Sequence, residues 1–296
     1  MADRHHGLSQ PEDPRRDTAD DQGSRPAQQQ EWPGREDRMT PAADHGETRY
    51  QGSGKLSGRR ALITGGDSGI GRAVAIAFAR EGADVAITYY DEHDDAEATA
   101  RLIRDAGQTA QTRAADLSEP DACRQVVDWA AEALGGLDIL VNNAAYQREA
   151  HFTDLSTQQV ERTFRTNILA YIHVARAALR HLGPGGVIIN TGSVAGSHGH
   201  PTLVDYAATK GAIHAFTRSL GLALADHEVR VNCVAPGPVW TPLIPATLEP
   251  DHVGRFGDNT LWKRPAQPAE IAPTYVFLAS DDGRYYTGQV FSPTGR

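Results

Sequence analysis

Residues 61–71 read Ala-Leu-Ile-Thr-Gly-Gly-Asp-Ser-Gly-Ile-Gly, and this stretch decides the fold. Its first four residues form a short apolar run that is typical of a buried strand. After the glycine-rich turn, residues 69–81 place Ile70, Val74 and Phe78 at helical spacing. A strand, a glycine turn and a helix in this order indicate the first half of a βαβ unit.

The same alternation of apolar strands and amphipathic helices continues along the chain. Further strands are expected at 84–88, 109–114, 137–141, 186–190, 229–234 and near 288–292. Helices are expected between them, at 94–106, 119–134, 156–182, 203–226 and near 268–279. This alternation implies right-handed crossovers and a parallel sheet covered on both faces. We therefore expect an α/β fold, a single Rossmann-type doubly wound parallel sheet with helices on both faces.

Composition narrows the class of protein. The chain has 296 residues, of which 40% are hydrophobic and 23% charged, and its net charge is −9. A negative charge disfavours nucleic acid or an anionic membrane as partner. We expect a cytoplasmic protein, because the first ten residues are too polar for a signal peptide and no apolar run is long enough for a membrane span. Cys123 and Cys233 stand alone, which favours reduced thiols over a disulfide or a zinc site.

The chain divides into two zones. Residues 1–54 are a polar extension, and the composition of the first thirty predicts disorder. The single aromatic residues from Trp32 to Tyr50 leave open a second interpretation, an extended arm docked on a neighbour. Residues 55–296 carry the periodic pattern and are expected to form the catalytic domain.

One proline-rich segment interrupts the pattern of the second zone. Residues 238–266 contain five prolines and cannot form one helix. We expect a mobile lid over the ligand-binding edge of the sheet, with an apolar wall made by Trp240, Leu243, Ile244 and Leu248.

The glycine turn predicts a dinucleotide site. Glycines there let the backbone approach a pyrophosphate, while the start of the following helix offers unpaired N–H groups. NAD enzymes place a carboxylate at the end of the second strand, where this chain has Tyr89. NADP is therefore favoured, although the acidic residues 91–95 keep NAD open.

A second set of residues predicts the chemistry. Tyr206 and Lys210 are four residues apart on one expected helix, hence on one face. An ammonium group near the phenol is expected to lower its pKa and make it a general acid/base. Ser193 follows the fifth strand at the ligand-binding edge of the sheet, where its hydroxyl can hold a substrate oxygen. His198 and His200 lie beside this site without a third metal ligand, so we expect no metal.

These motifs resemble the short-chain dehydrogenase/reductase family over about residues 55–292. The match consists of Thr64–Gly71, Asn142-Asn143-Ala144-Ala145, Ser193, Tyr206 with Lys210, and Pro236-Gly237, in the family's order and spacing. The resemblance implies that Asn167 is a fourth catalytic residue, which kinks its helix and holds a proton-relay water. It also implies that Lys210 bridges to the ribose hydroxyls.

The resemblance extends the expected cofactor site. It implies an adenine pocket after the third strand, an asparagine that ties the central sheet together, and a Val and a Thr that hold the nicotinamide carboxamide. The residues expected to bind the cofactor are Gly65, Asp67, Ser68, Gly69, Ile70, Gly71, Tyr89, Asp116, Leu117, Asn143, Tyr206, Lys210, Pro236, Gly237, Val239 and Thr241.

Function follows from the same resemblance. The chain departs from many NADP-dependent members by carrying Asp67-Ser68 where they have a basic residue, and by Ala145 in place of a glycine. With its polar extension it is similar to bacterial general stress proteins and NADP-dependent aldehyde reductases. We expect an NAD(P)-dependent oxidoreductase acting on a small aldehyde, ketone or alcohol, as a homotetramer or homodimer. The alternatives are an NAD-dependent sugar or polyol dehydrogenase and a non-catalytic, dinucleotide-binding regulatory protein.

Overall fold

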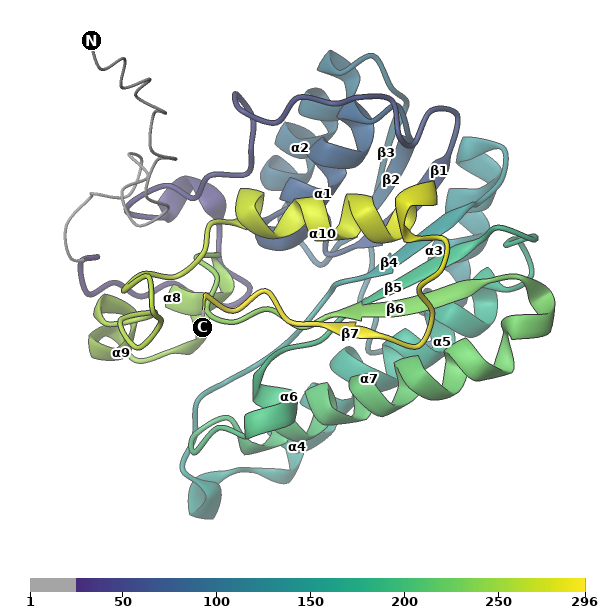
Figure 1. The fold of residues 1–296 in the computed structure, drawn as a ribbon. Coiled ribbons are helices and arrows are strands. Elements are labelled where there is room, and N and C mark those ends of the chain that lie inside the picture. The colour runs from purple at the N-terminus through teal and green to yellow at the C-terminus, as the bar shows by residue number, and fades with distance from the viewer. Residues whose placement is uncertain (1–24, 296) are drawn as a thin grey trace, which may run out of the picture.

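The protein forms a doubly wound parallel sheet with helices on both faces (Figure 1), which confirms the expected fold class. The computed structural model describes residues 25–295. Seven strands pair in parallel in the order β3-β2-β1-β4-β5-β6-β7. The strands are β1 (Arg60–Thr64), β2 (Asp84–Tyr89), β3 (Ala110–Ala114), β4 (Ile139–Asn142), β5 (Val187–Thr191), β6 (Arg230–Val234) and β7 (Val290–Phe291). The strand order reverses between β1 and β4, and this switch point creates a crevice at the carboxyl ends of the strands.

Helices form two layers around this sheet. The α-helices are α1 (Gly69–Arg80), α2 (His93–Asp105), α3 (Pro120–Leu134), α4 (Thr157–Phe164), α5 (Ala170–Ala178), α6 (Ala195–His198), α7 (Val204–Ala223), α8 (Leu243–Thr247), α9 (Pro250–Gly254) and α10 (Pro268–Ala279). Helices α1, α2 and α10 cover one face, while α3, α5 and α7 cover the other (Figure 1). Each layer encloses its own apolar core against the sheet, and the central strands are buried on both sides.

The expected helix 156–182 is not continuous. Helix α4 ends at Phe164, a π-helical turn spans Arg165–Leu169, and α5 ends at Ala178. The wide turn contains Asn167, whose side chain bonds to the backbone of Tyr146 rather than pointing to solvent. A π-turn inserted in a helix often marks a functional site.

The polar extension is not disordered where it is described. Residues 1–24 lie outside the described part, but residues 25–54 run as an arm across the sheet's carboxyl edge and along α1 (Figure 1). The arm makes contacts with its own chain. Trp240 Nε1 donates to the carbonyl oxygen of Pro41 at 2.8 Å, and the Tyr50 hydroxyl donates to Glu81 at 2.6 Å.

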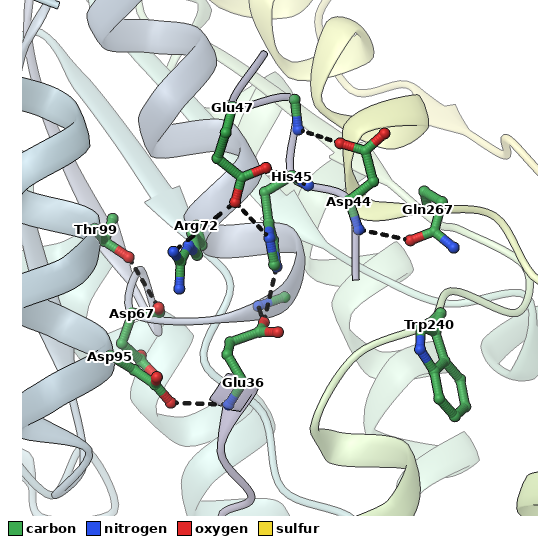
Figure 2. A network of polar contacts seen from close by, with 12 residues as sticks. Glu36, Asp44, His45, Glu47, Asp67, Arg72, Asp95, Thr99, Trp240 and Gln267 are labelled. Atoms are coloured by element: carbon green, nitrogen blue, oxygen red, sulfur yellow. Dashed lines mark hydrogen bonds and ion pairs between the residues drawn. The ribbon is translucent and has the colours of Figure 1, made fainter. Parts of the chain in front are cut away.

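A buried polar network fastens the middle of the arm to the start of α1 (Figure 2). Glu36 Oε1 accepts a hydrogen bond from the Gly69 amide at 2.7 Å and lies 2.8 Å from His45 Nε2. His45 Nδ1 lies 3.1 Å from Glu47, which also faces Arg72 at 3.8 Å. A carboxylate at a helix N-terminus interacts favourably with the helix dipole. The arm thus contributes a negative charge to the first turn of α1.

His45 is the ionisable centre of this network. Burial opposes its protonation, but the charge of Glu36 and hydrogen bonds to both glutamates raise its pKa to about 9. Burial also opposes ionisation of Glu47, yet the hydrogen bond and charge of His45 lower the pKa of Glu47 to about 2. The network therefore holds paired charges at neutral pH.

We predict that His45→Ala destabilises the protein in a pH-dependent way. At pH 7 the change leaves the buried Glu36 carboxylate without its cation and removes one of the two cations that face the partly exposed Glu47. This loss should cost about 3 kcal/mol and lower Tm by roughly 6–12 °C. Folding raises the pKa of His45 from 6.5 to about 9, so its protonated form stabilises the folded state fully below pH 6.5. This stabilisation is lost as pH rises through about 9. The gap in Tm between wild type and variant should narrow at pH 10, as measured by calorimetry.

The matched control is His227→Ala, because His227 is exposed. Its Tm should follow the wild type at both pH values. A His45→Ala gap that stays constant from pH 7 to pH 10 would contradict the ionic role of this histidine.

Candidate active site

A cavity of about 760 Å³ opens at the carboxyl ends of the strands. Its wall includes every residue that the sequence predicted for catalysis or cofactor binding except Gly71 and Asn167, which lie behind it. The structure therefore brings together segments that follow β1, β2, β3, β4, β5 and β6. This convergence is the arrangement expected of a ligand site in a doubly wound sheet.

The glycine turn lies tightly against the loop that follows β4. Gly65 has a φ of +62°, and a Cβ there would lie 3.0 Å from Ala144 Cα. A Cβ on Gly71 would lie 1.8 Å from the carbonyl oxygen of Gly65. The Asn143 side-chain amide donates to that same oxygen at 2.9 Å, and the backbone N–H of Asn143 donates to Thr64 Oγ1 at 2.9 Å. Glycines are thus required where two backbone segments meet at the cavity floor.

Asp67 is a buried carboxyl group at the wall of the cavity. Burial, and then the charge of Glu92, raise its pKa to about 8. Burial also raises the pKa of Glu92. Tyr89 ends β2 beside them, and its hydroxyl lies 2.9 Å from His93 Nδ1. At neutral pH the Asp67 side chain is therefore uncharged.

The predicted catalytic residues meet on the other side of β1. Tyr206 and Lys210 project from α7, and Lys210 Nζ lies 5.4 Å from the centroid of the Tyr206 ring. Lys210 Nζ donates to the carbonyl oxygen of Thr191 at 2.8 Å, next to Ser193. Burial lowers the pKa of Lys210 to about 8.

The phenol of Tyr206 does not have the lowered pKa that its sequence spacing predicted. Burial raises the pKa to about 12, against the opposing effect of a hydrogen bond with Ser193. Lys210 lies over the ring, and its ammonium group donates to a backbone carbonyl. In this structure Tyr206 is a neutral phenol, hence a proton donor.

Asn167 lies in the π-helical turn and connects two walls of the site. Its Oδ1 accepts from the Tyr146 amide at 2.7 Å, and its Nδ2 donates to the Tyr146 carbonyl at 2.8 Å. Nδ2 also donates to Thr209 Oγ1 on α7 at 3.1 Å. Asn167 therefore fixes the loop after β4 against the helix that carries Tyr206.

The expected lid wall is partly wrong. Leu243, Ile244 and Leu248 line the cavity, but Trp240 does not. Trp240 is fully buried and packs with Met39 of the arm. The sequence pattern places the indole on the substrate side, because nothing in that pattern indicates that the arm covers Trp240.

Several wall residues were not predicted from the sequence. Trp32 and Pro33 reach the cavity from the arm, and Gln147, Glu149 and Arg162 reach it from the region after β4. Only Trp32 carried a signal, as a lone aromatic residue in a polar segment.

Unpaired polar atoms lie at the cavity wall. Thr88 Oγ1 and Thr166 Oγ1 are buried and have no hydrogen-bond partner within residues 25–295. Buried hydroxyls without partners are costly. Together with the close-packed glycine turn, they fit a site whose bound molecule supplies polar groups.

Comparison with known proteins shows the family of this chain. Residues 65–294 match the family model described as enoyl-(acyl carrier protein) reductase. General stress protein 39 of Bacillus subtilis is 48% identical over 272 residues, covering 91% of this chain and 95% of that protein. The chain belongs to the short-chain dehydrogenase/reductase family.

Two plant members of the family carry names that state an activity. Glucose and ribitol dehydrogenase of Daucus carota is 49% identical over 277 residues, covering 91% of this chain and 95% of that protein. NADPH-dependent aldehyde reductase 1 of Arabidopsis thaliana, a chloroplastic protein, is 47% identical over 272 residues, covering 89% of this chain and 94% of that protein.

Solved structures of the family share the fold. A short-chain dehydrogenase from Burkholderia cenocepacia in complex with NADP superposes with a TM-score of 0.78 at 37% identity. The match covers 81% of this chain and 98% of that one. As a short-chain dehydrogenase/reductase, the protein is an oxidoreductase. None of its helices within residues 25–295 has the length and apolar character needed to cross a bilayer.

We predict that Gly71→Ala destabilises this short-chain dehydrogenase/reductase. The added methyl group would lie 1.8 Å from the carbonyl oxygen of Gly65, which also accepts a hydrogen bond from the Asn143 side chain. Overpacking of this kind costs about 1–3 kcal/mol, so Tm should fall by several degrees. Gly183→Ala is the control, since a Cβ at Gly183 meets nothing within 4 Å. Equal Tm values for both variants would contradict the tight contact.

Proposed function

We propose that the protein is an NAD(P)-dependent oxidoreductase that transfers hydride between the nicotinamide and a small aldehyde, ketone or alcohol. One observation carries the proposal: Tyr206, Lys210 and Ser193 line the same cavity as the glycine turn. A phenol, an ammonium group and a hydroxyl beside a dinucleotide site suit proton transfer to or from an oxygen as hydride moves.

The cofactor would occupy the cavity from β3 to β6. The turn from Gly65 to Gly71 would hold the pyrophosphate, Asp116 and Leu117 the adenine, and the segment 236–241 the nicotinamide. The bound nicotinamide supplies or accepts the hydride. Close-packed glycines and unpaired threonine hydroxyls in the wall support this assignment.

The chain's own residues perform the proton chemistry. Ser193 would hold the substrate oxygen within reach of Tyr206, and the neutral phenol would donate its proton to that oxygen during reduction. Lys210 would stabilise the phenolate that forms and bind the ribose hydroxyls. Asn167 positions the loop at Tyr146 through two hydrogen bonds. We propose that it also holds a water molecule that relays the proton.

NADP is the favoured cofactor. Tyr89 ends β2 where a carboxylate would repel a 2′-phosphate, and Asp67 is uncharged at neutral pH. The aldehyde reductase relative is named for NADPH, and the Burkholderia relative binds NADP. These observations support NADP over NAD.

A sugar or polyol substrate is the second candidate. The substrate side of the cavity carries polar groups. Thr202 Oγ1 donates to the Glu149 carboxylate at 2.6 Å, and His252 Nδ1 lies 3.0 Å from the same carboxylate. Such groups suit a hydroxylated substrate, and one relative is named for glucose and ribitol. A panel of aldehydes and polyols, followed by NADPH absorbance, separates the two. The non-catalytic alternative is disfavoured, because Ser193, Tyr206 and Lys210 are all retained.

We further propose a cytoplasmic homotetramer or homodimer. Leu169 and Ile172 around α5 and Leu222 on α7 are apolar and exposed. Apolar side chains exposed on two neighbouring helices suit contacts between subunits. The expected interfaces therefore use residues 119–134 and 156–182 or 203–226.

We predict that Tyr206→Phe lowers kcat about 10²- to 10⁴-fold, because the ring stays in place while the proton donor is lost. The Kd for NADPH should change little, as measured by fluorescence titration. Tyr285→Phe is the control, since Tyr285 is 95% exposed. Retention of most activity by Tyr206→Phe would overturn the mechanism.

We also predict that the preference for NADP weakens as pH rises through about 8. A raised pKa keeps Asp67 neutral below this value, and ionisation above it adds a negative charge beside Glu92 and Asp95. Between pH 7 and 9 a phosphate monoester is already mostly dianionic, so its own titration contributes little. The ratio of Kd for NADP to Kd for NAD should therefore rise several-fold across this range.

Asp67→Asn should make this ratio independent of pH, because the amide cannot ionise. Asp91→Asn is the control, since Asp91 is exposed and lies outside the cavity wall. It should keep the wild-type pH dependence. A constant ratio in the wild type would contradict the titration of Asp67.

A further inference from the structure

The arm is fixed on both sides of Trp32. Before Trp32, the backbone N–H of Gln30 donates to the carbonyl oxygen of Pro245 in α8 at 2.8 Å. After it, Gly34 has a φ of +88°, and a Cβ there would lie 2.5 Å from the carbonyl oxygen of Pro242. Two residues further on, Glu36 bonds to the Gly69 amide at the start of α1. The position of Trp32 is therefore set by contacts on the lid segment and on the glycine turn.

Between these anchors the indole of Trp32 lies among aromatic and cationic side chains. Its ring centroid is 4.9 Å from that of Tyr90 and 5.3 Å from that of Tyr146. The guanidinium carbon of Arg162 lies 5.4 Å from the indole centroid. Trp32 and Pro33 both line the cavity. The arm thus contributes side chains to the binding cavity itself.

The neighbours of Trp32 show which end of the cavity it closes. Tyr90 directly follows β2. Arg162 bonds to Asp116 at 2.8 Å and to Ser118 at 2.9 Å, both in the segment after β3. Strands β2 and β3 lie on the opposite side of β1 from β5, after which Ser193 comes. Trp32 therefore lies toward the end of the cavity remote from Ser193, where the proposed cofactor would place its adenosine half.

The indole N–H provides an independent observation. Trp32 Nε1 is buried and finds no acceptor among residues 25–295. An indole N–H has no second role in hydrogen bonding, since it can only donate. Leaving it unpaired in a buried position costs free energy, and a bound molecule with an acceptor would recover that cost.

We propose that Trp32 is a binding residue for the adenosine half of the dinucleotide. Its ring closes the adenosine end of the cavity and its N–H donates a hydrogen bond to that half. The inference rests on the proposed function, because it requires a dinucleotide in the cavity. It adds to that function a residue from outside the sheet domain, supplied by the arm of the same chain.

A purely structural role for Trp32 predicts different behaviour. If the indole only held the arm in place, its loss would lower thermal stability without selectively affecting adenosine ligands. Trp32→Ala removes both ring and N–H, whereas Trp32→Phe keeps a smaller aromatic ring and removes the N–H together with part of the ring surface. Trp262→Ala is the matched control, since Trp262 is partly exposed in the lid segment and does not line the cavity.

The experiment measures the affinity of the full-length protein for 2′,5′-ADP and for NADPH by isothermal titration calorimetry. Trp32→Ala should raise both Kd values about tenfold, and Trp32→Phe about threefold, as expected from loss of ring contact and of one hydrogen bond. Trp262→Ala should match the wild type. In a parallel titration 2′,5′-ADP should quench the tryptophan emission of wild type and Trp262→Ala, and this quenching should disappear in Trp32→Phe.

The outcomes distinguish failure of the proposed cofactor site from failure of the proposed role of Trp32. A wild type that binds neither NADPH nor 2′,5′-ADP overturns the proposed NADP site and this inference with it. A wild type that binds both, with Kd values unchanged in Trp32→Ala and quenching retained in Trp32→Phe, overturns the inference alone. A Tm that falls in Trp32→Ala while both affinities hold assigns the indole to packing of the arm, and also overturns it.

Discussion

The site depends on the contact between two backbones at the switch point of the sheet. Gly65 and Gly71 meet at one carbonyl oxygen, which also accepts the hydrogen bond from Asn143. This contact joins the first βα turn to the loop after β4, on the two sides of the crevice. No side chain fits between the backbones, so the glycines are required by geometry rather than by the loop's flexibility. The other segments of the cavity are arranged around this junction.

The arm illustrates how a polar segment gains order from a surface rather than from a core of its own. Its composition provides too little apolar area to offset the entropy of ordering. On the folded domain, however, its polar groups find fixed partners. The Glu36 carboxylate meets the positive end of α1, and His45 is held as a cation between two glutamates. Trp240 adds an apolar contact by burying its ring against Met39.

The sequence could predict the fold and a set of residues that the fold brings to one cavity, because both follow from local patterns. The strand–turn–helix at residues 61–81 and the helical spacing of Tyr206 and Lys210 are properties of short windows. Long-range contacts left no such trace. Nothing near Trp240 indicated that the arm would bury it, and the kink at Asn167 was expected from the family resemblance rather than from the residues around it. The pKa of Tyr206 was predicted in the wrong direction, because spacing on a helix fixes the face of Lys210 but not the carbonyl to which its ammonium group turns.

The arm also changes how the lid and the cofactor end of the cavity are related. In a sheet domain alone, residues 238–266 and the turn from Gly65 to Gly71 would be connected only through the sheet. Here residues 30–36 form one continuous segment of the arm. Gln30 bonds to Pro245 in α8, and Glu36 bonds to the Gly69 amide at the start of α1. A movement of α8 away from the cavity would pull on the same segment that holds the start of α1. The two ends of the cavity are therefore joined by a segment that runs outside the sheet, and the contact of Glu36 with His45 lies at its attachment to α1.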